Sequence, residues 1–290
     1  MTPPAPHTRP DWTAHTVVRE GGVRLACRES GPREGARGRD VVLLHGLAGH
    51  AGEWDVLARL LHADGHRIVA FDQRGHGAGE RYPQDVSRAA YVADTLAVLD
   101  HLALHRPVLV GQSLGGHTAL LTAAARPGRL GGLVLVEAGP GGPDPQVADG
   151  VGRWLASWPL PFPSREAAVR FLGGGPVGEG WADGLEEREG EGPGLWPRFD
   201  PGVMVRSLAE NAARSFWDEW RAVDCPTLAV VAEKGIIRAD DLDTMVRLRP
   251  DTRAASVPGT GHDLHLERPD ALHALIADFL DPCLGAHSNS

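Results

Sequence analysis

The chain has 290 residues, 42% of them hydrophobic, which is enough to bury a large core in one main domain. Its formal net charge of −9 would repel nucleic-acid phosphates and anionic membranes, so the composition argues against both as partners. No stretch is apolar enough to cross a bilayer and the first residues lack the apolar segment of a secretory signal, so we expect a cytoplasmic protein. The three cysteines are too scattered for a disulfide framework, and none lies in a metal-ligand pair.

Eight short apolar runs, separated by helical patterns, predict the strands of one sheet. The runs are residues 17–18, 23–27, 41–44, 68–71, 108–110, 133–136, 228–231 and 254–257. Residues 92–103 carry one apolar helix face after the fourth run, and residues 272–280 carry another near the end of the chain. Strands that alternate with helices favour an α/β fold with a mostly parallel, eight-stranded sheet covered by helices on both faces. Catalytic residues are then expected at the carboxyl ends of the strands.

The alternation stops in the second half of the chain, over a stretch too long for an ordinary connection in this fold. We therefore predict a core of residues 1–138 and 225–290, interrupted by an inserted helical cap, or lid, of residues 139–224. Six of the eight tryptophans lie in this insert. They either pack a small lid onto the body or line an apolar pocket for an acyl or aryl group.

Within the insert, residues 147–158 and 204–212 carry short amphipathic patterns that predict two helices. The second pattern follows Asp200-Pro201, a typical helix start. The stretch from Gly173 to Gly194 is rich in glycine and acidic residues, and this composition predicts a mobile loop.

The segment from Val108 to Gly116, V-L-V-G-Q-S-L-G-G, is an apolar strand that breaks at a glycine-flanked serine and continues as a helical pattern. This G-x-S-x-G pattern between a strand and a helix is typical of a nucleophile elbow. The glycines remove Cβ atoms that would collide at so sharp a turn, and the hydroxyl of Ser113 is left exposed. Leu114 opens the following helix, so we expect its N–H to point where an oxyanion can form.

Three further segments lie where the same chemistry would need them. They are residues 41–49, an apolar run that ends in a glycine-rich turn, residues 71–77, the turn after the next run, and residues 257–262, the loop after the last run. With the serine motif among them, the chain resembles the α/β-hydrolase superfamily from residue 41 to the C-terminal helix, apart from the insert. The resemblance implies that the loop after the first of these runs supplies a second oxyanion donor, the N–H of Leu47, as the partner of the Leu114 N–H.

A serine hydroxyl is a weak nucleophile near neutral pH, so it needs a base that takes its proton and returns that proton to the leaving group. His262 follows the last predicted strand in a P-G-T-G loop and precedes the final helix, as the catalytic histidine of the superfamily does. We therefore expect His262 to be the base. His265 is the nearest competitor among the 14 histidines.

The acid of the expected triad departs from the commonest pattern of the superfamily, because the chain carries Gly235 where an aspartate usually stands. Some members carry the acid one strand earlier, and in this chain that strand ends in Glu137. A carboxylate at either strand end could orient His262. Because the usual position carries glycine, we favour Glu137, although Glu137 could instead only bond turn amides. Asp240 and Asp241 are alternatives, although Asp240 also suits a helix N-cap. A site without any acid is the third possibility.

These residues predict a serine hydrolase that cleaves a carboxylic ester or a lactone through an acyl-serine intermediate. Ser113 attacks the carbonyl, His262 moves the proton, Glu137 orients His262, and the N–H groups of Leu47 and Leu114 bind the oxyanion. We expect a partly apolar small-molecule substrate and no need for a metal or organic cofactor. A serine nucleophile argues against dehalogenase and epoxide-hydrolase relatives, which use aspartate. Two alternatives stay open: a lyase, C–C hydrolase or acyltransferase with the same serine and histidine, and a non-catalytic ligand-binding protein.

Overall fold

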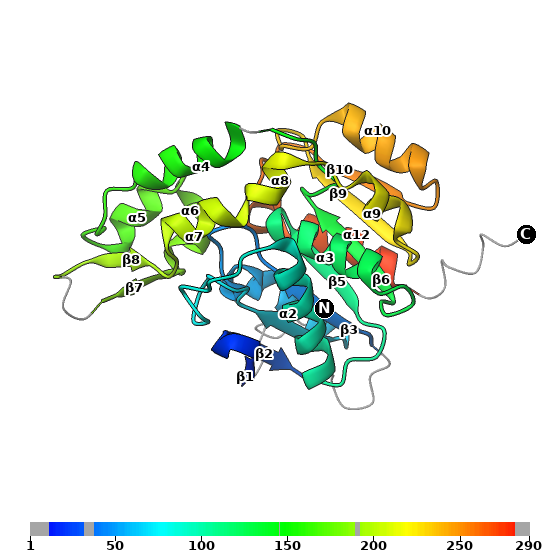
Figure 1. The fold of residues 1–290 in the computed structure, drawn as a ribbon, viewed down its shortest axis with the longest axis horizontal. Coiled ribbons are helices and arrows are strands. Elements are labelled where there is room, and N and C mark those ends of the chain that lie inside the picture. The colour runs from blue at the N-terminus through cyan, green and yellow to red at the C-terminus, as the bar shows by residue number, and fades with distance from the viewer. Residues whose placement is uncertain (1–11, 32–37, 145, 189–191, 282–290) are drawn as a thin grey trace, which may run out of the picture.

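The computed structural model describes residues 12–31, 38–144, 146–188 and 192–281. Within them, eight strands form one sheet in the order β1-β2-β4-β3-β5-β6-β9-β10, with helices on both faces (Figure 1). The strands are β1 (Thr13–Val18), β2 (Arg24–Ser30), β3 (Asp40–Leu44), β4 (Arg67–Phe71), β5 (Val108–Gln112), β6 (Gly132–Val136), β9 (Thr227–Ala232) and β10 (Arg253–Val257). Strand β2 pairs antiparallel with β1 and β4, and all other pairs are parallel. The predicted fold class is confirmed, and each predicted strand overlaps an observed one.

The inner strands are apolar on both faces, which explains why they appear in the sequence as continuous apolar runs. In β3, Val42 and Leu44 pack in one core cluster, whereas Val41 and Leu43 pack in the other. The first cluster includes side chains of α2 (Arg88–His101), α3 (Leu114–Ala125), α9 (Trp217–Ala222) and α10 (Ala239–Leu248). The second cluster includes side chains of α1 (Asp55–Ala63) and α12 (Pro269–Leu280). The sheet is therefore held between two helical layers.

Between β6 and β9 the described chain carries a helical insertion, α4 to α9, with a small antiparallel pair of strands. Its elements before α9 are α4 (Gln146–Ala156), α5 (Arg165–Phe171), α6 (Gly175–Ala182), β7 (Leu185–Glu187), β8 (Leu195–Pro197), α7 (Pro201–Ser207) and α8 (Ala209–Ala213). Trp158, Phe162 and Phe199 belong to a separate cluster that consists mostly of insertion residues and includes Ala48 of the loop after β3. The predicted helical insertion is confirmed; that it is a cap domain with boundaries at residues 139 and 224 stays a prediction.

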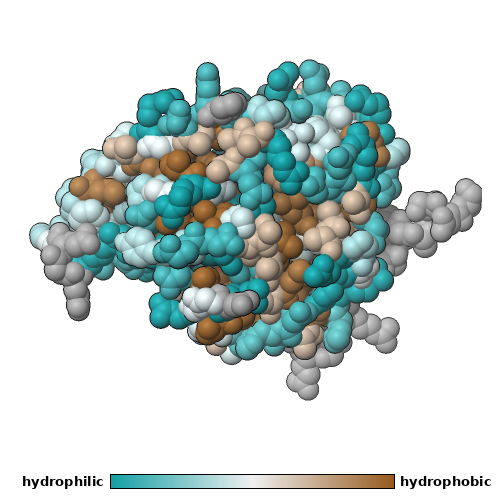
Figure 2. Space-filling model, in the orientation of Figure 1, coloured by the Kyte–Doolittle hydropathy of each residue, from teal (hydrophilic) through white to brown (hydrophobic). Residues whose placement is uncertain are grey.

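Apolar residues also gather on the surface of the insertion, at the left of the molecule in Figure 2. Val147 and Trp154 on α4 are each 41% exposed, and Phe171 on α5 is 44% exposed. Trp154 contacts Trp158, and Phe171 contacts Phe162, so two of these exposed side chains adjoin the buried aromatic residues of the insertion.

Two predictions for the insertion are wrong in part. The Gly173–Gly194 stretch, expected as a mobile loop, contains α6 and β7. Pro176 suits the first turn of α6, and Ala182 is buried in the cluster of the insertion, so packing overrides the glycine-rich composition. The helix expected over 204–212 is divided between α7 and α8 at Leu208, whose N–H bonds the carbonyl three residues back and tightens the turn.

The remaining helical segments are short. They are the 3₁₀ turns η1 (Glu20–Gly22) and η2 (Ala51–Trp54) and the helix α11 (Leu264–Glu267). The turn η2 comes soon after β3 and α11 comes soon after β10, so both lie next to loops at the carboxyl edge of the sheet. No helix in the described ranges is both long enough and apolar enough to cross a membrane.

Candidate active site

Ser113 stands at the turn between β5 and α3, at the carboxyl end of a strand in the middle of the sheet. Its backbone has φ +50° and ψ −116°, a conformation that costs a non-glycine residue on the order of 1–3 kcal/mol. A Cβ at Gly115 would overlap the Leu44 carbonyl oxygen, and one at Gly111 would overlap the backbone of Gly115. The Ser113 N–H donates to the Val136 carbonyl at 3.0 Å. The strained serine and the two required glycines form the predicted elbow.

The backbone N–H groups of Leu47 and Leu114 have no acceptor among the residues that the structure describes. Leu114 directly follows Ser113 and opens α3, where the helix dipole is positive. The loop of Leu47 comes close to the serine, because a Cβ at Gly46 would overlap the Gln112 side-chain oxygen and lie 3.5 Å from the Ser113 Cβ. Two unpaired N–H groups near one hydroxyl can bind the oxygen anion of a tetrahedral intermediate.

Two buried histidines hold the loop that carries Leu47. His45 Nε2 accepts the Gln73 N–H at 3.0 Å, and His76 Nε2 accepts the Ala48 N–H at 3.0 Å. Burial lowers the pKa of His45 to about 4 and that of His76 to about 3. Both rings are therefore neutral near pH 7 and remain available as acceptors. Together they fix the backbone around Leu47.

His262, in the loop after β10, is paired with a buried carboxylate. Its Nδ1 lies 3.4 Å from Oε2 of Glu137. Glu137 follows β6, is 0% exposed and has φ +50°, so it is a second strained residue at this edge of the sheet. The carboxylate also accepts the N–H groups of Ala232 at 2.6 Å and Ile236 at 2.7 Å. The carboxylate of Glu137 thus bonds turn amides and contacts the imidazole, and it can hold the proton of His262 on Nδ1.

Gly235 stands where the superfamily usually carries an aspartate, and its missing side chain makes room for Glu137. A Cβ at position 235 would overlap the carboxylate of Glu137. The acid from β6 therefore fills the volume that a side chain after β9 would need. In this arrangement, side chains at both positions would collide.

The alternative acids and the alternative histidine lie elsewhere. Asp240 and Asp241 are exposed in the first turn of α10, and within the described residues neither bonds His262. His265 is buried on α11, with Nε2 3.5 Å from a carboxylate oxygen of Glu53. Of the candidates, the structure brings Glu137 to His262 and leaves Asp240 in the solvent.

Gln112 belongs to the site, and sequence reasoning missed it. Its side-chain amide donates to Nε2 of His262 at 3.2 Å and to the His262 carbonyl at 3.1 Å. Nε2 is therefore an acceptor that faces the residue before Ser113. Among described residues the Ser113 hydroxyl has no hydrogen-bond partner, so proton transfer requires it to turn toward Nε2. The only feature of the sequence that points to a role for Gln112 is its position directly before Ser113.

Helix α6 of the insertion is bonded to both functional loops. His50, in the loop that carries Leu47, donates its Nε2–H to the Gly180 carbonyl at 3.0 Å. Trp181 donates its Nε1–H to Oδ2 of Asp263 at 3.2 Å, and Asp263 directly follows the candidate base. The insertion thus contacts the oxyanion side and the histidine side of the site at once.

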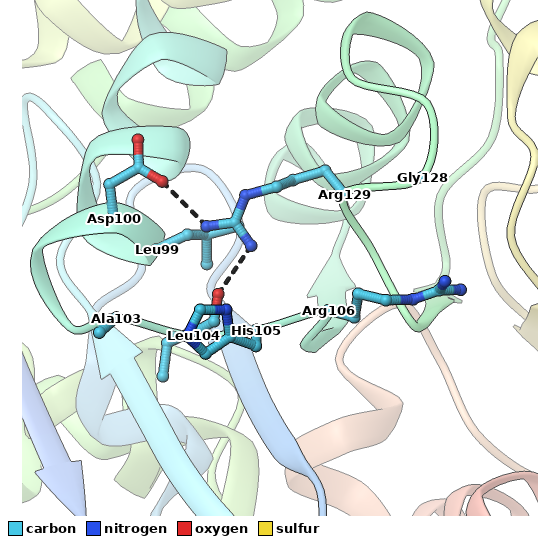
Figure 3. A pocket seen from close by; sticks show the side chains of 8 residues that line it. All are labelled: Leu99, Asp100, Ala103, Leu104, His105, Arg106, Gly128 and Arg129. Atoms are coloured by element: carbon cyan, nitrogen blue, oxygen red, sulfur yellow. Dashed lines mark hydrogen bonds and ion pairs between the residues drawn. The ribbon is translucent and has the colours of Figure 1, made fainter.

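The described residues show no sign of a metal centre, and one hollow lies at the wrong edge of the sheet for this site. No three His, Cys, Asp or Glu side chains in the described ranges could hold a metal ion. The hollow, of about 470 Å³, lies between the end of α2 and the loop after α3 (Figure 3). Arg129 crosses it and bonds Asp100 at 2.9 Å and the Leu104 carbonyl at 2.7 Å. The residues that line the hollow precede β5 or β6, whereas Ser113 follows β5.

The mostly parallel sheet, the strained serine elbow and the helical insertion after β6 define the class as a doubly covered α/β protein with a hydrolase-type nucleophile turn. The chain belongs to the alpha/beta hydrolase family, whose sequence model matches residues 41–275. The resemblance inferred from the motifs is thereby confirmed.

Known relatives cover most of the chain and differ in the reactions their names describe. N-formylmaleamate deformylase from Pseudomonas putida KT2440 is 29% identical over 278 residues, which are 92% of this chain and 98% of the relative. The sn-1-specific diacylglycerol lipase of Mus musculus is 28% identical over 263 residues, 83% of this chain and 80% of the relative. The crystal structure of E-2-(acetamidomethylene)succinate hydrolase shares the fold, with a TM-score of 0.82 at 24% identity over 93% of this chain and 99% of that one.

Proposed function

We propose that the protein is a serine hydrolase that cleaves a carboxylic ester or a lactone through an acyl-serine intermediate. The observation that carries the proposal is the buried carboxylate of Glu137 beside Nδ1 of His262, whose Nε2 faces the residue next to Ser113. Ser113 and Glu137 both have strained backbones, and strain of this kind collects at functional sites.

In the acylation step, the Ser113 oxygen attacks the carbonyl carbon while its proton passes to Nε2 of His262. The Glu137 carboxylate stabilises the imidazolium, and the N–H groups of Leu47 and Leu114 bind the oxyanion. As the tetrahedral intermediate collapses, the leaving alcohol takes the proton from Nε2 and the acyl group stays on Ser113. A water molecule, deprotonated by the same Nε2, then releases the acid and restores the serine.

The insertion supports a partly apolar substrate. Trp154, Trp158 and Trp181 contact one another, with ring centroids 5.3 to 6.1 Å apart. Trp181 also bonds Asp263, so this aromatic cluster adjoins the loop of His262. An ester-type bond is favoured because a lipase is among the relatives that match over most of their length, whereas the deformylase among them keeps amide cleavage as the competing reaction.

The test combines covalent labelling with a substrate panel. A fluorophosphonate probe should label the protein, and the label should disappear in Ser113→Ala and fall strongly in His262→Ala. The panel contains 4-nitrophenyl esters of several acyl lengths, lactones and matched anilides. Faster turnover of esters or lactones than of anilides, dependent on Ser113, supports the proposal. Folded protein that is not labelled would favour a ligand-binding role, and faster anilide cleavage would favour an amidase.

A further inference from the structure

Arg88, the first residue of α2, carries a buried guanidinium to which no carboxylate of the described residues is hydrogen-bonded. The residue is 2% exposed, and its Nε, Nη1 and Nη2 all lie in the protein interior. Its Cζ lies 4.0 Å from the centre of the Tyr91 ring, a contact that favours a cation, and the side chains of Tyr91 and Glu210 partly offset the lowering of its pKa by burial. A buried guanidinium without a hydrogen-bonded carboxylate is costly to a folded protein, so the packing around Arg88 compensates its charge only in part.

The other two buried arginines in the described ranges are paired, and both are 6% exposed. Arg74 bonds the two carboxylate oxygens of Asp94, at 2.7 Å each. Arg249 bonds Asp251 at 3.0 Å. The other two buried guanidinium groups are each hydrogen-bonded to a carboxylate of the chain, so we expect the carboxylate that hydrogen-bonds Arg88 to come from outside the chain.

Arg88 lies close to the candidate oxyanion residues. The Tyr91 ring, which covers the guanidinium, packs with Leu114 and Leu208 in one buried cluster, and Leu47 packs against the same cluster. The guanidinium is therefore separated by one side chain from the residues whose N–H groups have no acceptor. Leu208 brings the insertion into this cluster, at the junction of α7 and α8.

His117 adds a second unpaired group to this region. It lies one helical turn after Ser113, to whose carbonyl its N–H donates at 2.9 Å, and within the described chain neither ring nitrogen has a partner. Burial, followed by the positive charges of Arg88 and Arg214, lowers the pKa of His117 to about 3. The ring is therefore neutral near pH 7 and can donate one N–H beside a negatively charged group.

We infer that Arg88 binds a carboxylate group of the substrate that is separate from the scissile ester bond. This inference rests on the proposed ester hydrolysis. The planar fork of arginine fits a carboxylate through two parallel hydrogen bonds. A monoanion fits the local charge better than a phosphate dianion, because Arg214 is held by Glu219 at 2.9 Å. Glu210, which accepts the backbone N–H of Arg88 at 2.9 Å, adds negative charge beside the guanidinium and so also disfavours a dianion.

The test compares two esters of similar length, the anionic 4-nitrophenyl hydrogen glutarate and the neutral 4-nitrophenyl valerate. In Arg88→Met, kcat/KM for the anionic ester should fall about 10- to 100-fold, since hydrogen bonds to charged groups are lost. The neutral ester should change by less than about threefold. Arg88→Lys keeps the charge without the fork and should fall between the two. Arg214→Met, which removes a nearby but paired and exposed arginine, is the matched control and should keep the wild-type preference.

Stability and inhibition complete the test. Arg88→Met should unfold at the same temperature as the wild type or higher, because it removes a buried charge to which no carboxylate is hydrogen-bonded in the described chain. Glutarate should inhibit hydrolysis of the neutral ester by the wild type more strongly than inorganic phosphate does, and this inhibition should weaken in Arg88→Met. An equal loss on both esters, an unchanged preference, a clear drop in Tm or stronger inhibition by phosphate would overturn the inference. If the wild type cleaves neither ester, or Ser113→Ala cleaves both, the proposed function itself fails.

Discussion

The two halves of the carboxyl edge of the sheet meet at Ser113 and are built in opposite ways. Beyond β6, β9 and β10 lies a buried carboxylate, Glu137, against the imidazole of His262, which is protonated in the proposed reaction. Beyond β3 and β4, burial keeps His45 and His76 neutral, and the Leu47 N–H has no acceptor among the described residues. The strand order therefore matches the charge separation in the proposed transition state, since one half stabilises positive charge and the other stabilises negative charge.

The largest expected effect comes from removing the charge of Glu137 in the carboxylate half of the edge. Glu137→Gln keeps the size of the side chain but removes its charge, so kcat/KM for an activated aryl ester should fall on the order of a thousandfold or more. Asp240→Asn, on the exposed turn of α10, is the matched control and should stay within about twofold. Steady-state kinetics of both variants with the same aryl ester measure the two losses in kcat/KM. A greater loss in Asp240→Asn than in Glu137→Gln would remove Glu137 from the site.

The second effect comes from the neighbouring strand. Gly235→Ala adds a methyl group where the Glu137 carboxylate lies, which should displace that carboxylate from His262. We expect roughly a 10- to 100-fold loss of kcat and a loss of about 1–3 kcal/mol in the free energy of unfolding. Ester kinetics and urea unfolding measure the two quantities.

A double variant sharpens this comparison by moving the acid from one strand end to the other. Glu137→Gly combined with Gly235→Asp should be at least tenfold more active than Glu137→Gly alone, since an aspartate at 235 would enter the space that Glu137 leaves. Full activity in Gly235→Ala would instead mean that position 235 does not constrain the acid.

A smaller effect tests the oxyanion half. His76→Leu removes the acceptor of the Ala48 N–H while keeping apolar bulk. We expect kcat to fall about tenfold with little change in KM, because oxyanion contacts strengthen in the transition state. The unpaired buried N–H should also lower the free energy of unfolding by about 1–3 kcal/mol. A change in KM alone would place His76 in substrate binding.

The smallest expected effect is the contribution of each buried histidine to the pH dependence of the free energy of unfolding. The pKa values of His45, His76 and His117 are lowered by burial from 6.5 to about 4, 3 and 3. Below pH 6.5 the unfolded chain binds protons that the folded chain does not, so stability should fall as the pH decreases toward 4. The slope is at most about 1.4 kcal/mol per pH unit for each histidine. Urea unfolding between pH 7.5 and 5 measures it, and His76→Leu should show a shallower slope; equal slopes would contradict the assignment.

Local patterns predicted the sheet and the elbow because their causes are local. Strands buried on both faces need unbroken apolar runs, and the turn at Ser113 needs glycines where backbones touch. The contact between Glu137 and His262 also followed from a simple rule, namely that parallel strands end at the same edge.

The rest depended on packing between distant segments, which a single sequence does not display. Helix α6 forms in a glycine-rich stretch because Ala182 and its neighbours are buried in the insertion. Gln112 reaches His262 across 150 positions of the chain. That no carboxylate is hydrogen-bonded to the Arg88 guanidinium in the described chain could be recognised only from the packed structure.

The double attachment of α6, through His50 to Gly180 and through Trp181 to Asp263, also bears on protein engineering. Chimeras in which the whole insertion, α6 included, is replaced by that of a related protein would lose both hydrogen bonds. Grafts that retain this helix and replace α4, α5, α7 and α8 should preserve the catalytic alignment while changing substrate scope. The boundaries of an exchanged segment should therefore lie within the insertion, on either side of α6, rather than at the two ends of the insertion.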